Sequence, residues 1–221
     1  AKTILKEIGQ DGQSNKILEK LSKEIEIDFE RILKVAKFPI KNFRLIGKIK
    51  KGSFEKISAK SDFSNNKHLD ISLIKQKDSD LKILEVYSDI AMPLLNDYKF
   101  FSGLDGGDLL FVSRFDKKKS INELTINNFK LNNAPTLAKI LTLADLKGLT
   151  DTLKGEGISF DTLSIKYVTD PSTMTINEIF MIGPSVSVLV DGYVEKKSGL
   201  VSLRGTLVPA KTLNTLVSKI P

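Results

Sequence analysis

The sequence predicts a β-rich α+β protein built on an antiparallel meander with a few short helices. Most of the chain consists of short segments in which every second residue is apolar, which is the period of a strand with one buried face. Polar turn sequences rich in Lys, Asn, Asp, Ser and Gly separate these segments. The 221 residues, of which 41% are hydrophobic and 28% charged, are enough for one large β domain or two small ones.

The N-terminal part predicts a helix and then a run of hairpins. Residues 2–23 are expected to form a helix or a frayed end, because Ile17, Leu18 and Leu21 have helical spacing after a possible cap, Ser14. We expect a strand at residues 25–29, a turn or short helix over residues 30–38, and hairpins broken at KKGS, SNNKH and QKDSD. The alternating positions of these hairpins are Phe43, Leu45, Ile49, Ile57, Ala59, Ser61, Phe63, Leu69, Ile71, Leu73, Leu81, Ile83 and Val86.

The middle of the chain interrupts this alternation. Residues 90–102, IAMPLLNDYKFFS, predict one short helix that is ended by GLDGG. A strand resumes at Leu109, DKKKS turns the chain, and residues 121–130 predict the next strand. We therefore expect another hairpin directly after this helix.

Residues 131–160, LNNAPTLAKILTLADLKGLTDTLKGEGISF, predict two short helices rather than one amphipathic helix. The first is expected over residues 135–142, with Asn133 as a cap and Pro135 in its first turn. The second is expected to be capped near Asp145 and closed by Gly155 and Gly157. It places Leu146, Leu149 and Leu153 on one face, whereas the first places Leu137, Ile140, Leu141 and Ala144 on one face. We expect both helices to pack on the sheet.

The last third returns to strands. Ile158 and Phe160 are out of phase with Leu163, Ile165 and Tyr167, which predicts a bulge near Asp161. Apolar and polar residues then alternate on both sides of a turn predicted at KKSG, and residues 210–219 predict a final short helix. The alternating positions are Val186, Val188, Val190, Val194, Val201, Leu203, Gly205 and Leu207.

Residue chemistry argues against catalysis, metal binding, cofactors and base reading. The chain has no cysteine, which excludes thiolate nucleophiles and zinc–sulfur sites, and its single histidine, His68, lies in a polar turn. Asp105 and Asp108 flank two glycines but lack the further ligands of a calcium loop, and no phosphate-binding loop is present. The net charge of +7 comes almost entirely from lysine, whereas nucleic-acid binders that read bases rely on arginine.

Lysine clusters at Lys50–Lys51, Lys117–Lys119 and Lys196–Lys197 fall in predicted turns. They are either solvated turn residues that protect sheet edges or a rim that faces anionic lipid head groups.

Residues 81–221 resemble the C-terminal region of the YhdP-type branch of the AsmA-like family of bacterial envelope proteins. Three stretches carry the resemblance: SDIAMPLLNDYKFFSGLDGGDLLF, INNFKLNNAPTLAKILTLADLKGLTDTLKGEGISFDTL, and MIGPSVSVLVDGYVEKKSGLVSLRGTLVPAKTLNTLVSKIP. The most specific positions in the central stretch are Pro135, Gly148, Gly155 and Gly157. The family pattern continues past a final Ile-Pro, whereas this chain stops at Pro221, so the region is expected to be truncated before its closing strands.

The resemblance implies a long twisted sheet curved into an open groove with an apolar concave face, and short helices packed on it or capping it. Residues 1–80, the N-terminal helix and meander, are expected to be part of the same sheet as residues 81–221. The implied function is phospholipid transfer between the inner and outer membranes, as a bridge in the periplasm, in a protein anchored at the inner membrane through a segment outside this chain. Envelope proteins are possible partners, and the alternative is a periplasmic scaffold or regulator of outer-membrane assembly that carries no lipid.

The candidate residues that contact acyl chains come from the cleanest alternations. An uncovered apolar sheet face would be a lipid or partner site. The candidates are Ile165, Tyr167, Val186, Val188, Val190, Val194, Leu203 and Leu207.

Overall fold

The structure, a computed structural model, describes residues 22–32, 39–63, 66–143 and 145–209. It divides into an N-terminal unit, Ala1–Glu85, and a C-terminal unit, Val86–Pro221. Most of the helix expected over residues 2–23 and the helix expected over residues 210–219 lie outside the described residues. The turn or short helix expected over residues 30–38 is described only at residues 30–32, where it is wrong, because these residues belong to the first strand. Both units are antiparallel β-meanders, and the short helices among the described residues belong to the C-terminal unit, so the predicted β-rich class is confirmed.

The N-terminal unit is a meander with one apolar and one charged face. Its strands are β1 (Lys23–Ile32), β2 (Ile40–Lys50), β3 (Ser53–Phe63) and β4 (Lys67–Lys75), while β5 (Lys82–Ser88) crosses the boundary between the units. The predicted turns all separate consecutive strands. A row of apolar residues crosses β1 to β4 on one face: Ile27, Leu45, Ala59 and Ile71. On the other face Arg44 Nε donates to Glu26 Oε1 at 3.0 Å.

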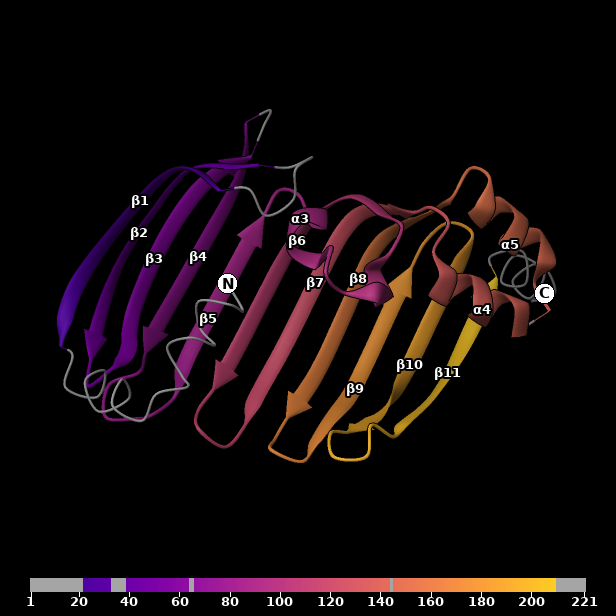
Figure 1. Cartoon of the computed structure of the whole chain (residues 1–221). Coiled ribbons are helices and arrows are strands. Elements are labelled where there is room, and N and C mark those ends of the chain that lie inside the picture. The colour runs from indigo at the N-terminus through magenta and orange to yellow at the C-terminus, as the bar shows by residue number, and fades with distance from the viewer. Residues whose placement is uncertain (1–21, 33–38, 64–65, 144, 210–221) are drawn as a thin grey trace, which may run out of the picture. The chain divides into compact units, whose positions relative to one another are not determined.

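The C-terminal unit contains the strands β6 to β11 (Figure 1). Consecutive strands pair antiparallel, and β6 and β11 are not paired with each other in the part of the chain that the structure describes, so this sheet is open. The strands are β6 (Leu104–Phe115), β7 (Ser120–Leu131), β8 (Ile158–Thr169), β9 (Thr173–Ile182), β10 (Val186–Glu195) and β11 (Val201–Pro209). The helices are α3 (Met92–Leu95), the 3₁₀ helix η1 (Lys99–Phe101), α4 (Pro135–Leu143) and α5 (Lys147–Lys154).

The helices all attach to the same end of these strands. Leu104 at the start of β6 pairs with Leu131 at the end of β7, which pairs with Ile158 at the start of β8. Because α3 and η1 precede β6, and α4 and α5 join β7 to β8, we call this the helix end. The turns at residues 116–119, 170–172 and 196–200 lie at the opposite end, here called the turn end (bottom of the sheet in Figure 1).

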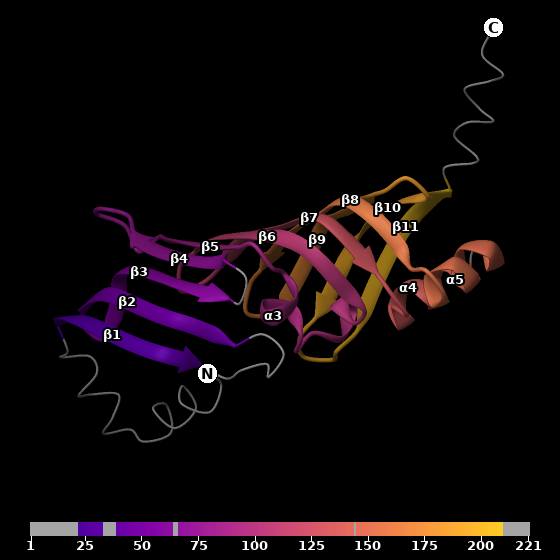
Figure 2. The same cartoon turned by 90° about the horizontal axis from the view of Figure 1, so that it is seen from above.

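The core of the C-terminal unit lies between the helices and one face of the sheet, called the inner face. Leu137 and Leu141 of α4 and Leu153 of α5 are buried in the same cluster as the strand residues. The rings of Phe129 and Phe160 stack at a centroid distance of 5.4 Å within it. Figure 2 shows the same unit from above, with α4 and α5 beside the sheet.

Both predicted helices of residues 131–160 are confirmed, with two corrections. Asp145 does not cap α5: the cap position is Leu146, which makes no side-chain cap hydrogen bond, and Asp145 has a φ of 55° in the turn before it. Ile140 is 36% exposed instead of sharing the buried face of α4. A backbone hydrogen bond, rather than a side-chain cap, closes the helix pair: Asn133 N–H donates to Leu153 O at 3.0 Å.

The single helix expected over residues 90–102 is wrong. The segment forms the short α3 and the separate η1, and GLDGG does not end a helix, because Leu104–Gly107 already belongs to β6. Gly106 and Gly107 have φ values of 72° and 79°, so the strand bends there without ending. The bend aims the Gly107 carbonyl at α3, where it accepts a hydrogen bond from Ala91 N–H at 2.9 Å.

The change of phase near Asp161 is present, but the predicted bulge is wrong, because the register between β7 and β8 does not shift there. Phe160 and Leu163 both point into the core, and on β7 Ile126 and Phe129 do the same around Asn128, whose φ is 52°. Since both strands change phase together, the register stays continuous on either side of the bend.

Within the described ranges, no helix combines the length and the apolar character needed to span a bilayer.

Candidate functional site: the inner face of the C-terminal unit

Two apolar rows cross the inner face from β6 to β11. Each row follows the strand register, so its members are direct cross-strand neighbours. The first row, nearer the helix end, contains Leu109, Ile126, Leu163, Met181, Val188 and Leu207. The second row contains Phe111, Leu124, Ile165, Ile179, Val190 and Gly205.

The rows are long enough to accommodate a hydrocarbon chain. Neighbouring strands are about 4.8 Å apart, so each row spans about 24 Å from its first strand to its last. One leaflet of a bilayer contributes about 15 Å to a hydrocarbon core of about 30 Å. The apolar band is therefore longer than one acyl chain and has the same apolar chemistry.

On β8 to β11 burial falls from the helix end to the turn end. In the first row Ile126 is 0% exposed and Met181 9%, because α3, α4 and α5 belong to the same packed cluster. Second-row residues such as Ile165 and Val190 are half-buried and pack against its edge. Beyond them, on β11, Leu203 is 49% and Val201 56% exposed. The inner face is therefore a closed core under the helices and opens toward the turn end only on β8 to β11, most of all on β11.

A polar group interrupts the apolar face on β6 to β8. Ser113 and Asn122 are buried cross-strand neighbours, and Ser113 Oγ donates to Asn122 Oδ1 at 2.7 Å. Tyr167 is the next residue of this row on β8, and its phenol is half-buried. Burial raises the pKa of Tyr167, and the nearby charge of Tyr98 adds to the effect. Tyr167 is therefore an uncharged donor at neutral pH.

The outer face of the same sheet carries charged pairs and also exposed apolar side chains, such as the cross-strand neighbours Phe180 and Leu189. Lys166 Nζ lies 2.9 Å from Glu178 Oε1, and this hydrogen bond and its charge raise the pKa of Lys166. Arg204 Nε lies 3.0 Å from Asp191 Oδ2. Such exposed cross-strand pairs contribute little stability. What distinguishes the inner face is that its apolar rows continue into the buried core.

All predicted acyl-contact residues lie on the inner face, as the register shows. The structure nevertheless separates them by burial. Val186 and Val188 are 0% and 6% exposed and belong to the closed core. The accessible members are Ile165, Tyr167, Val190, Val194, Leu203 and Leu207.

Sequence reasoning missed several neighbours of these residues. Ile176 and Ile179 of β9 both lie on the inner face, although they are three residues apart, because the register shifts between them. A strict period of two cannot assign both to one face. Tyr98 was also missed, since it comes from the segment expected to be a single helix and gave no signal of its own.

Two lysine clusters, Lys117–Lys119 and Lys196–Lys197, lie at the turn end as predicted for turns. Asp116 Oδ1 accepts the backbone N–H groups of Lys118 and Lys119 at 2.7 and 2.8 Å, so this acid closes the turn. The lysines flank the end of the inner face that is most exposed.

Other candidate sites have ordinary structural explanations. His68 is exposed on β4 with Nδ1 2.9 Å from Asp62 Oδ1, and Asp108 Oδ2 accepts from Asn127 Nδ2 at 3.0 Å on the outer face. The described residues contain no group of three or more His, Cys, Asp or Glu residues placed to hold a metal.

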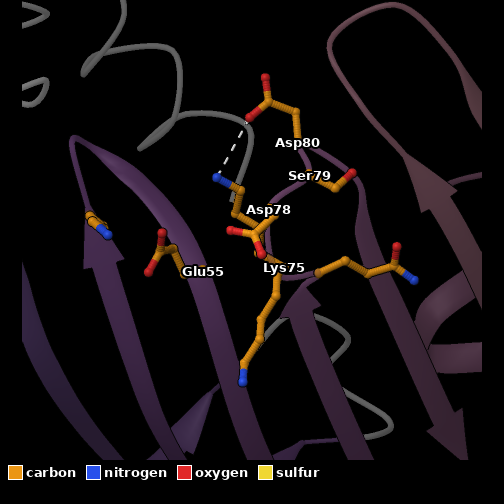
Figure 3. Close-up of a pocket in the computed structure, with 8 residues that line it drawn as sticks. Glu55, Lys75, Asp78, Ser79 and Asp80 are labelled. Carbon is orange, nitrogen blue, oxygen red and sulfur yellow. Dashed lines mark ion pairs between the residues drawn. The ribbon is translucent and has the colours of Figure 1, made fainter.

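A polar hollow in the N-terminal unit lies around the turn between β4 and β5 (Figure 3). Its charges have both signs, and Lys75 Nζ lies 3.5 Å from Asp80 Oδ1. Ser79 Oγ accepts the Leu81 N–H at 3.0 Å, a bond local to the turn. The hollow is therefore a solvated hairpin end. Its lining residues are Lys50, Glu55, Lys75, Gln76, Lys77, Asp78, Ser79 and Asp80.

Comparison of the chain with family models, with curated proteins and with solved structures gives no match. The candidate site therefore depends on the geometry of the inner face, and the resemblance to the AsmA-like family stays an expectation.

Proposed function

We propose that this chain is a non-enzymatic phospholipid-binding module whose inner face in the C-terminal unit holds acyl chains. The single observation that carries the proposal is the apolar band, which continues out of the core to the half-exposed Leu203. An apolar surface that emerges from a core and is bordered by polar residues is typical of a lipid or partner site.

The wider role follows from the family resemblance. As part of a periplasmic protein anchored at the inner membrane, the module would pass phospholipids between the inner and outer membranes in envelope biogenesis. The lysines of the turn end support this role, because ammonium groups attract anionic head groups near a membrane surface. No catalytic or cofactor chemistry is part of the proposal.

The alternative is a scaffold or regulator of outer-membrane assembly that carries no lipid. The observation in its favour is the burial of Val186 and of the first row from Leu109 to Val188 in the core that the helices share. In that case the half-exposed residues would contact a protein partner.

Leu203 and Leu189 provide a matched pair of variants to test the proposal. Both are leucines with 49% exposure, on adjacent strands, but Leu203 lies on the inner face and Leu189 on the outer face. We expect Leu203→Asp to weaken binding of a fluorescent phospholipid by about tenfold or more, because a carboxylate in the band must be desolvated by the acyl chain. Leu189→Asp should bind like the unmodified chain.

The measurement is a fluorescence titration, together with native mass spectrometry of the purified chain for bound phospholipid. Equal binding by the two variants would contradict the assignment of the inner face. Absence of bound lipid and of any uptake by the unmodified chain would favour the scaffold instead.

A further inference from the structure

A hollow of about 380 Å³ lies between α4 and α5, the two helices that join β7 to β8 (Figure 1). Ala138, Lys139 and Thr142 of α4 line one side of it, and Thr150 and Lys154 of α5 line the other. None of these residues belongs to the apolar rows of the inner face. The hollow is therefore a feature separate from the proposed acyl-chain site.

The surface of the hollow is apolar although two of its lining residues are threonines. Thr142 Oγ1 donates to Ala138 O at 2.8 Å, and Thr150 Oγ1 donates to Leu146 O at 3.2 Å. Each hydroxyl is satisfied by the backbone of its own helix, which leaves the methyl groups of the threonines and of Ala138 to form the surface. The hollow can therefore accept an apolar group without burying an unpaired hydroxyl.

The spacing of the lining residues limits what fits into the hollow. Ala138 and Thr142 are four residues apart on α4, as are Thr150 and Lys154 on α5, so the hollow extends over about 6 Å of each helix. An acyl chain that spans one leaflet is about 15 Å long, more than twice this length. The hollow suits one large apolar side chain instead, the kind of anchor that dominates the energy of protein interfaces.

Two lysines border the hollow, one from each helix. Lys139 and Lys154 are exposed, and neither forms an ion pair with any residue that the structure describes. The nearest acidic residues in sequence, Asp145 and Asp151, do not line the hollow. Two unpaired ammonium groups beside an apolar hollow are complementary to carboxylates that flank an apolar side chain.

We propose that the hollow between α4 and α5 is a docking site for an acidic peptide segment of a partner protein. One apolar side chain of the segment fills the hollow, and acidic residues beside it pair with Lys139 and Lys154. The helix pair then has a second role besides covering the core, since it recruits a partner. The proposal does not depend on lipid binding, because the hollow lies outside the apolar rows of the inner face.

The experiment titrates the full chain into three fluorescein-labelled peptides and measures fluorescence anisotropy. The first peptide has one phenylalanine with two glutamates on each side, the second has lysines in place of the glutamates, and the third has alanine in place of the phenylalanine. The variants are Lys139→Glu, Lys154→Glu and Ala138→Leu, the last of which fills the hollow. Lys147→Glu is the matched control, because Lys147 is an exposed lysine of α5 that does not line the hollow. Far-UV circular dichroism checks that all variants are folded.

We expect the acidic peptide with phenylalanine to bind more tightly than the other two peptides. Each charge reversal at the hollow should weaken this binding about fivefold, because an exposed ion pair is replaced by repulsion. Ala138→Leu should weaken it about tenfold or more, because the anchor side chain can no longer enter. Lys147→Glu should change it less than about twofold.

Equal binding of the acidic and basic peptides, or equal weakening by Lys147→Glu, overturns the proposal, because the two lysines of the hollow would then not select the ligand. Unchanged binding by Ala138→Leu also overturns it, because no side chain would occupy the hollow. Vesicles of phosphatidylglycerol test a membrane as the occupant. If the vesicles bind and the acidic peptide does not, and Lys139→Glu and Lys154→Glu weaken vesicle binding, the surface faces a membrane and the peptide proposal fails.

Discussion

Gly107 is a position where the structure predicts that a single added methyl group disturbs both the backbone and the core. Its φ is 79°, a conformation that costs an alanine about 1–2 kcal/mol. A Cβ added there would lie 2.9 Å from Ile126 Cγ2 and 3.0 Å from both Asn127 O and Phe129 Cβ. Ile126 and Phe129 are 0% and 3% exposed, so they cannot move without disturbing the core, and overpacking of this kind costs about 1–3 kcal/mol.

Gly107→Ala should therefore lower the free energy of unfolding by about 2–5 kcal/mol. Gly148→Ala is the matched control, because Gly148 lies in α5 and a Cβ added there meets nothing within 4 Å. It should raise the free energy of unfolding by about 0.4–1 kcal/mol through the lower entropy of the unfolded chain.

The assay is urea unfolding of the full chain, followed by far-UV circular dichroism, since the chain has no tryptophan. The midpoint should shift in opposite directions for the two variants at an unchanged slope. A Gly107→Ala protein as stable as the unmodified chain would refute the reasoning, because it would mean that β6 does not bend where the structure places the bend.

Two further substitutions test the polar side chains of the C-terminal unit. Asn122→Ala should lower the free energy of unfolding by about 1–3 kcal/mol, because the buried Ser113 hydroxyl loses its acceptor. Adding Ser113→Ala should restore part of this loss, measured by the same urea titration. Hydrogen bonds from the Ser172 hydroxyl, and after it from backbone N–H groups of the turn, lower the pKa of Asp170. The ionised Asp170 therefore stabilises the folded protein above the pKa of the unfolded chain, about 3.9, and this stabilisation is lost as the pH falls through the lower pKa of the folded state. Asp170→Asn should therefore flatten the acid limb of stability against pH, measured by thermal melts from pH 5 downward; an unchanged limb would contradict this origin.

The sequence was sufficient to predict the strands because their signals are local. Alternation and turn residues locate β6 to β11 to within a few residues, and Pro135 marks the start of α4. The expected single helix over residues 90–102 failed for a non-local reason. Local spacing could not show that the chain from Gly103 onward is already paired with β7.

Only part of the candidate site could be predicted from the sequence, again because sequence signals are local. Alternation placed Val188 and Val190 correctly on one face, but it carries no information on which rows the helices cover. Coverage depends on α4 and α5, whose position is fixed by contacts with residues distant in sequence. Alternation also identified Tyr167, whereas Tyr98 was beyond the reach of any period because it lies outside the strands.

The hydrogen bond from Asn133 N–H to Leu153 O has a consequence for the order of folding. Most strand pairs of the C-terminal unit join across short turns, whereas β7 and β8 are separated by residues 132–157. Closing a loop that is about eight times longer costs roughly 2 kcal/mol more in chain entropy. The bond brings the two ends of this loop together through α4 and α5, whose contacts with each other are local. We therefore expect α4 and α5 to form early in folding and to bring β8 next to β7. Substitutions within these two helices should then slow folding more than they speed unfolding.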